Sequence, residues 1–125
     1  MRKCSQPYLR KDLLVTFENA TTKVIAFRDD RNWSQFHNPK DLAISISLEA
    51  SELLELFQWS GIDTDVNSKT DGMEDELADI MIYCIYMADR LGIDLPSAIE
   101  KKIAKNETKY PVDKARGVAR KYTEL

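Results

Sequence analysis

The stretch from Asn38 to Gln58, NPKDLAISISLEASELLELFQ, predicts a helix and carries the features that decide the fold. Asn38 followed by Pro39 is typical of a helix N-cap with proline at the first helical position. At about 100° per residue, the apolar side chains fall on one stripe, made of Leu42, Ile46, Leu53, Leu56 and Phe57. Glu49 falls inside this stripe and Glu52 lies at its edge. These carboxylates are unexpected, because a charge in an apolar face is costly unless it is compensated.

Apolar spacing and capping residues predict three more helices. The first runs from about Leu9 to Asp29, the third opens at Thr70 or Asp71 and ends at Leu91, and the fourth runs from residue 95 or 96 to about Lys109. A polar loop, residues 60–72, separates the second and third helices. No run of four or more residues alternates convincingly at period two, so strands are scarce. We therefore expect an all-α chain of four helices, with an extended leader (1–8) and an extended tail (112–125).

The composition narrows the class of protein. A chain of 125 residues is long enough for one domain with a real core, so we expect residues 1–125 to form a single domain. A net charge of −3 argues against a non-specific nucleic-acid binder. Cys4 and Cys84 form neither a disulfide framework nor a metal knuckle, which favours a reducing compartment. The apolar runs are far shorter than the roughly 20 residues of a membrane span, and we see no signal peptide. We expect a cytoplasmic protein.

The segment Ile80 to Ala88, IMIYCIYMA, is apolar almost all the way round its helix. Such a helix needs neighbours on every side. Four helices in one small chain rarely provide them, so we infer that a second subunit covers the remaining face. The expected architecture is an intersubunit helical bundle.

Two predicted helices each carry a pair of acids three residues apart, Glu49/Glu52 and Glu76/Asp79. This spacing places both carboxylates of a pair on adjacent turns. The two pairs converge if the helices pack antiparallel, and four converging carboxylates raise one another's pKa values. A hard divalent cation removes the repulsion, and an all-oxygen ligand set suits Mg²⁺ or Mn²⁺.

A simpler interpretation exists for each of these residues. Acids at this spacing are commonly solvated, although the apolar flanks of Glu49 argue against it there. Trp33 and Trp59 can cap the ends of a bundle, and Lys102 and Asn106 can lie on a surface. His37, the only histidine, precedes an N-cap and is more easily explained as structural than as catalytic.

The four acids, as Glu49-Ala-Ser-Glu52 and Glu76-Leu-Ala-Asp79, resemble the metal-binding signature of the MazG-like all-α nucleoside triphosphate pyrophosphatases. Further segments are similar to the dCTP pyrophosphatase branch of that family: FRDDRNWSQFH at 27–37, ELFQW at 55–59, KYP at 109–111, ARG at 115–117 and RKYTEL at 120–125. The resemblance extends from about Leu9 to the C-terminus. The tryptophans and the terminal hexapeptide are more specific than the acids alone.

The resemblance implies hydrolysis of a nucleoside triphosphate between its α- and β-phosphates, with dCTP or a modified dCTP as the expected substrate. It implies Mg²⁺ held by Glu49, Glu52, Glu76 and Asp79, and homodimers that pair into a homotetramer. Among the four acids we place Glu52 nearest the attacking water, because it lies at the edge of the apolar stripe. It also implies a set of substrate-binding residues, in which the tryptophans hold base and sugar and Lys102 and Tyr110 serve the phosphates: Trp33, His37, Trp59, Tyr83, Lys102, Asn106 and Tyr110.

One departure from the family pattern affects the substrate. Val24 stands where the better-known vertebrate members use a histidine in substrate binding, so the contact to base or sugar must differ here. Two alternatives therefore stay open. The same fold and metals could serve dUTP or a broad set of nucleoside triphosphates, or the chain could be a catalytically silent helical dimerisation module with structural acids.

Overall fold

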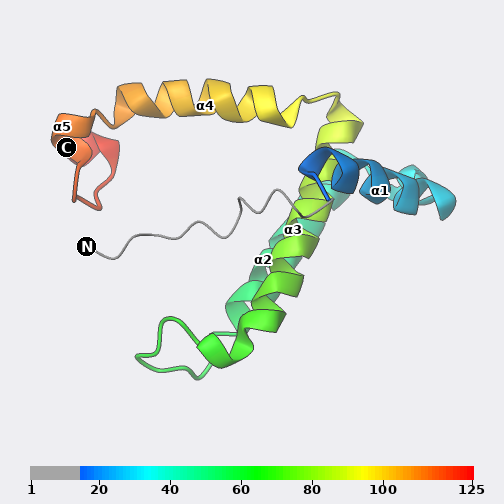
Figure 1. Cartoon of the computed structure of the whole chain (residues 1–125), viewed down its shortest axis with the longest axis horizontal. Coiled ribbons are helices and arrows are strands. Elements are labelled where there is room, and N and C mark those ends of the chain that lie inside the picture. Colours follow the sequence, from blue (N-terminus) through cyan, green and yellow to red (C-terminus); the bar gives the residue numbers. More distant parts are fainter. Residues whose placement is uncertain (1–14) are drawn as a thin grey trace. The chain divides into compact units, whose positions relative to one another are not determined.

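A computed structural model describes residues 15–125 of the chain, and these residues form helices joined by short connections (Figure 1). The part that the model describes contains no strand, which confirms the all-α prediction. In chain order its elements are α1 (Phe17–Asp30), the 3₁₀ turn η2 (Trp33–Phe36), α2 (Pro39–Glu55), η3 (Asn67–Lys69), α3 (Thr70–Leu91), α4 (Leu95–Lys109), α5 (Val112–Ala115) and η4 (Tyr122–Glu124). None of the described helices is long and apolar enough to cross a membrane.

The chain divides into two compact units, one ending at Arg90 and one running from Leu91 to Leu125. The first unit contains α1, α2 and α3, and the second contains α4, α5 and η4. Each unit is described by itself below. The expected single domain stays a prediction.

Side-chain caps fix the starts of three helices. The Thr16 hydroxyl accepts a hydrogen bond from the Asn19 amide at 3.1 Å and opens α1. The Asn38 side chain accepts from the Asp41 amide at 2.9 Å and opens α2, with Pro39 at the first helical position. Asp94 opens α4 in the same way. Each cap satisfies a backbone donor that the helix leaves free.

Three sequence-based boundaries need correction. The first helix is predicted to start near Leu9, and residues Leu9 to Leu14 lie outside the described part of the chain. Val15 and Thr16 are described and are not helical, because Thr16 is the N-cap and α1 begins at Phe17. Helix α2 ends at Glu55 rather than Gln58. The Lys69 ammonium donates to the Leu56 carbonyl at 2.9 Å, just beyond that end. The tail is not wholly extended, since it forms α5 and η4.

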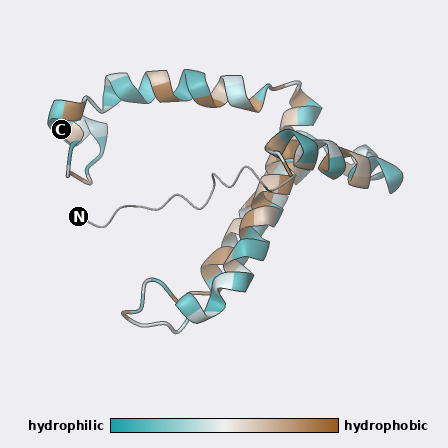
Figure 2. Cartoon of the chain, viewed as in Figure 1, coloured by the Kyte–Doolittle hydropathy of each residue, from teal (hydrophilic) through white to brown (hydrophobic). Residues whose placement is uncertain are grey.

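Helices α2 and α3 form an antiparallel pair, side by side along most of their length (Figure 1). The core of the first unit consists of five buried apolar side chains: Leu42, Val66, Ile85, Tyr86 and Ala88. Apolar residues also continue onto the outside of both helices, as the brown stretches of Figure 2 indicate. Ile44, Leu48 and Leu54 of α2 and Leu77 and Met81 of α3 are all exposed. Within the described residues of the first unit, an apolar face of the pair is therefore uncovered.

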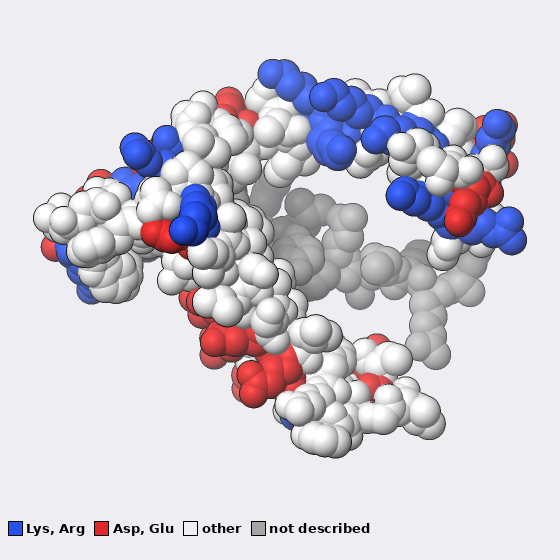
Figure 3. Space-filling view, turned by 180° about the vertical axis from the view of Figure 1, so that it is seen from behind, with Lys and Arg blue, Asp and Glu red and all other residues white. Residues whose placement is uncertain are grey.

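The second unit is rich in basic residues, and aromatic contacts join the end of α4 to the C-terminal segment. It contains eight Lys and Arg residues against five Asp and Glu, and the blue side chains along α4 are prominent in Figure 3. The Tyr110 and Tyr122 rings meet edge to face at 6.0 Å, and the Lys109 ammonium lies 4.8 Å from the Tyr122 ring. Ile99 and Ile103 of α4 are more than half exposed.

The cap of α2 provides a stability prediction. We expect Asn38→Ala to lower the free energy of unfolding by about 1 kcal/mol, because the Asp41 amide loses its side-chain acceptor and the Asp41 carboxylate loses the Asn38 Nδ2 donor. Urea unfolding followed by circular dichroism measures the change. Asn67→Ala is the matched control, since the Asn67 side chain makes no hydrogen bond within the described residues. Equal stability of the two variants would contradict the assignment of the cap.

Candidate metal and nucleotide site

Three carboxylates from the paired helices meet at one point. Glu49 of α2 and Glu76 and Asp79 of α3 each offer an oxygen, and these oxygens lie within 4.8 Å of one another. The three-residue spacing on α3 places Glu76 and Asp79 on adjacent turns, and antiparallel packing brings Glu49 opposite them. Glu52 lies beside this group, because it contributes to the raised pKa of both Glu49 and Glu76. The acidic side chains gather visibly on the α2–α3 pair in Figure 3.

The crowding shifts the ionisation of these groups. Burial, followed by the neighbouring Glu52, Asp79 and Glu76, raises the pKa of Glu49 to about 7. Burial also raises the pKa of Glu76, with Glu52 and Asp79 adding to the effect. Both shifts have the direction that desolvation and like charge produce in a carboxyl group. Near neutral pH the cluster therefore holds protons unless a cation replaces them.

The cluster fits a divalent cation better than a set of protons. Glu76 Oε2 is buried and has no hydrogen-bond partner in the described part of the chain. A buried oxygen without a partner is costly, and a bound cation would satisfy it. The oxygens of Glu49, Glu76 and Asp79 form an all-oxygen donor set, which suits hard ions such as Mg²⁺ or Mn²⁺.

A cavity of about 410 Å³ opens beside the cluster. Residues from α1, η2, α2 and α3 line it, namely Lys23, Val24, Phe27, Trp33, His37, Glu49, Asp79, Ile82, Tyr83 and Tyr86. Two of the clustered acids thus belong to a wall of the cavity, and most of the remaining lining is aromatic or aliphatic. This combination suits a ligand with an anionic end, held through metal, and a flat apolar end.

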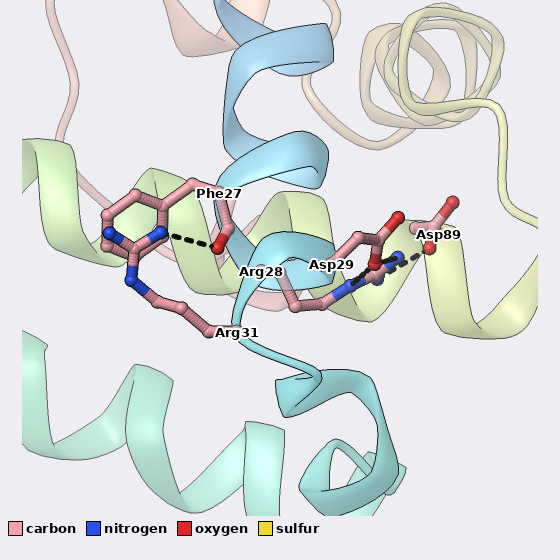
Figure 4. A network of polar contacts seen from close by, with 5 residues as sticks. All are labelled: Phe27, Arg28, Asp29, Arg31 and Asp89. Atoms are coloured by element: carbon pink, nitrogen blue, oxygen red, sulfur yellow. Dashed lines mark hydrogen bonds and ion pairs between the residues drawn. The ribbon is translucent and has the colours of Figure 1, made fainter.

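The aromatic wall is built by α1 and η2. Phe27 and Trp33 meet edge to face, with ring centroids 5.7 Å apart. The Arg31 guanidinium lies 3.6 Å from the centre of the Phe27 ring and donates to the Phe27 carbonyl at 2.9 Å (Figure 4). A guanidinium on a ring face is attracted by the ring quadrupole, so Arg31 holds Phe27 in place.

The structure distributes the seven expected substrate-binding residues over three places. Trp33, His37 and Tyr83 line the cavity. Trp59 does not line it. This residue is 92% exposed in the turn after α2 and adopts a left-handed backbone conformation with φ 68°. Lys102, Asn106 and Tyr110 belong to the second unit.

Several lining residues were not expected from the sequence. Lys23 and Phe27 are one helical turn apart on α1, a spacing that places them on one face, and Tyr86 is three residues beyond Tyr83 on α3. The i, i+4 spacing of Lys23 to Phe27, next to the Trp33 motif, was the available signal. Lys23 is the only Lys or Arg among the lining residues of the described chain.

The ionisation of Glu49 leads to a testable prediction. Its pKa is raised above the unfolded value, so the stability it contributes is present at acidic pH and is lost as pH rises through about 7. We expect Glu49→Gln to raise the melting temperature of the metal-free protein at pH 8, because it removes a repelled charge, and to abolish the increase that MgCl₂ gives the wild type.

Thermal melts at pH 5.5 and pH 8, with EDTA or with MgCl₂, provide the measurement. Glu55→Gln is the matched control, because Glu55 lies on the same helix but outside the cluster and the cavity. A lower melting temperature for Glu49→Gln at pH 8, with the MgCl₂ effect retained, would contradict the metal-site assignment.

Comparisons with family models, with curated proteins and with solved structures agree with one another. Residues 44–125 match the model of the MazG-like family. The dCTP pyrophosphatase 1 of Mus musculus is 37% identical over 116 residues, and that of Homo sapiens is 37% identical over 124 residues. Each alignment covers 88% of this chain and 68% of the relative. A solved structure, a pyrophosphatase from Archaeoglobus fulgidus, matches with a TM-score of 0.70 and 41% identity, covering 75% of this chain and 91% of that one.

The family match covers more than half of the chain, and the curated relatives are aligned over most of it. These findings confirm the resemblance and the fold class drawn from the sequence. The chain belongs to the MazG-like family.

Proposed function

We propose that this chain hydrolyses nucleoside triphosphates between the α- and β-phosphates, releasing a nucleoside monophosphate and pyrophosphate, with dCTP or a modified dCTP as the preferred substrate. The observation that carries the proposal is the carboxylate cluster of Glu49, Glu76 and Asp79 on the wall of an aromatic cavity. The relatives named dCTP pyrophosphatase 1 support the choice of nucleotide.

The four acids would form the site for Mg²⁺, with Mn²⁺ as a substitute, and they would divide between holding the ion and activating water. A bound divalent cation neutralises phosphate oxygens and activates a water molecule. Glu49, Glu76 and Asp79 would be its ligands, since their oxygens converge. Glu52 is exposed and adjoins Glu49 and Glu76, so we assign it to accept the proton of the attacking water.

The rest of the cavity would hold the nucleoside. Phe27 and Trp33 offer ring faces and edges on which a base can stack, a contact that tolerates different bases. Lys23 is the cation on the wall that can meet phosphate charge. Tyr83 and His37 lie on the same cavity wall and supply the hydrogen-bonding groups. Val24 lines the cavity where the family pattern has a histidine, so this chain distinguishes bases through other side chains.

Trp59, Lys102, Asn106 and Tyr110 remain proposed substrate contacts on the ground of the family resemblance. In the described chain Trp59 is almost fully exposed, and the other three residues lie in the second unit. Basic side chains such as Lys102 suit the phosphate end of the substrate.

The enzyme would assemble as a homodimer that pairs into a tetramer. The support is the uncovered apolar face of the α2–α3 pair, where Leu48 is 59% and Leu77 is 55% exposed. Exposed apolar residues that form a continuous face mark a protein–protein contact. A cytoplasmic location stays a prediction from cysteine usage.

Product analysis tests the activity. We expect purified protein with MgCl₂ to convert a triphosphate to monophosphate and pyrophosphate in a panel of the eight common nucleotides, with dCTP turned over fastest. EDTA and Glu49→Gln should each abolish turnover, because both remove the metal. Diphosphate plus phosphate would mean that a different bond is cleaved. dUTP is assayed beside the panel. Faster turnover of dUTP than of dCTP, or equal turnover of all the nucleotides, would contradict dCTP as the preferred substrate.

The assembly is tested by light scattering after size exclusion. We expect Leu48→Glu to reduce the particle mass to that of one chain or one dimer, since a charge on a buried contact is strongly unfavourable. Ile62→Glu is the matched control, because Ile62 is a fully exposed apolar residue in a loop. A monomeric wild type, or identical masses for all three proteins, would refute the proposed interface.

A further inference from the structure

Arg28 is the one buried polar or charged residue in the described part of the chain, with 7% of its surface exposed. A guanidinium in such a place is costly unless it is paired and hydrogen-bonded. An apolar residue at this position of α1 would pack against α3 without the cost of burying a charge. Packing alone therefore does not explain the arginine. The contacts of Arg28 therefore need an explanation.

Arg28 is held by two carboxylates. Its Nη1 donates to Asp89 Oδ2 of α3 at 2.6 Å, and its Nε donates to Asp29 Oδ1 at 2.8 Å (Figure 4). Both aspartates are about half exposed, whereas the arginine side chain is almost fully covered. The Arg28–Asp89 pair joins α1 to the C-terminal half of α3, from outside the cavity, because neither residue lines it.

The guanidinium also contacts an aromatic residue that does line the cavity. Its Cζ lies 5.7 Å from the centre of the Tyr86 ring, and Tyr86 is only 3% exposed. Tyr86 in turn stacks on His37, with ring centroids 4.9 Å apart and planes tilted by 32°. A continuous series of contacts thus runs from Asp89 at the surface through Arg28 and Tyr86 to His37 in the cavity wall.

We propose that the Arg28–Asp89 ion pair positions Tyr86, and through it His37, as the part of the cavity wall that receives the nucleoside end of the substrate. The inference rests on the proposed function and adds two positioning residues to it. Neither residue touches the carboxylate cluster, so the pair acts on nucleotide binding and not on the metal site.

The state of His37 agrees with this role. Burial, followed by the charge of Arg28, lowers the pKa of His37. Its Nδ1 is buried without a hydrogen-bond partner among the described residues, so a proton on Nδ1 would have no acceptor. An uncharged imidazole stacked on a fixed tyrosine offers a flat, neutral surface, and Nε2 is left as the nitrogen that carries the proton and can donate.

The test separates nucleoside binding from phosphate binding. Arg28→Met keeps the length and packing of the side chain but removes its charge. We expect its KM for dCTP and its inhibition constant for dCMP to rise about tenfold, because the wall residues lose their support. The inhibition constant for pyrophosphate and kcat should stay within about twofold of the wild type.

Conservative variants and a control complete the design. Asp89→Asn should shift KM and the dCMP constant in the same direction by about threefold, since Asp29 still pairs with Arg28. Arg28→Lys should recover part of the lost affinity, because an ammonium also interacts with a ring face. Arg90→Met is the matched control, an exposed arginine on α3 that forms no ion pair among the described residues.

Each outcome decides the proposal. Inhibition constants for dCMP and pyrophosphate that rise together would mean that Arg28 only supports the fold, and an unchanged KM would mean that the wall is independent of it. Either result overturns the inference. If Arg28→Met does not fold, Asp89→Asn and Arg28→Lys provide the same two readouts. A wild type that releases no monophosphate and pyrophosphate would overturn the proposed function instead, before any variant is compared.

Discussion

Repulsion between carboxylates at the contact of two helices is the constraint on which the first unit depends. Glu49, Glu76 and Asp79 occupy positions where the α2–α3 pair would otherwise pack apolar side chains. This arrangement disfavours the ionised carboxylates and raises their pKa values, most clearly that of Glu49. The helices nevertheless hold together, because Leu42 of α2 and Ile85 and Ala88 of α3 are buried further along the same pair. A bound cation would relieve this repulsion, as the proposed metal site requires.

The sequence correctly predicted those parts of the fold in which local sequence signals and tertiary packing favour the same structure. Asn38-Pro39 and Asp94 are caps whose side chains bond the backbone directly, and they defined the starts of α2 and α4. The helical wheel placed Glu49 in an apolar stripe, and antiparallel packing then brought it to the α3 acids. The end of α2 was missed, because Leu56 and Phe57 continue the apolar pattern while the Lys69 ammonium bonds the Leu56 carbonyl from a distant position.

The cavity was less predictable than the acid cluster. Lys23 and Tyr86 are separated by 63 positions, and only the crossing of α1 over α3 brings them to one wall. Arg28 belongs to a charged segment that the sequence alone predicts to be exposed. No neighbouring residue in the sequence indicates that Arg28 is buried or that it pairs with Asp89. The tail gave no periodicity, and the four-residue α5 is too short to show any. Long-range contacts, rather than local propensity, decide these features.

The lining of the cavity divides unevenly among the segments. The carboxylates come only from α2 and α3, whereas Lys23, Val24, Phe27 and Trp33 come from α1 and η2, and α3 adds Ile82, Tyr83 and Tyr86. If the cavity holds the nucleoside as proposed, a change in α1 would alter what the nucleoside meets and leave the cluster of acids intact. In the proposed enzyme, base preference could therefore diverge through α1 and η2 independently of hydrolysis, because the acids that would hold the metal lie on other helices.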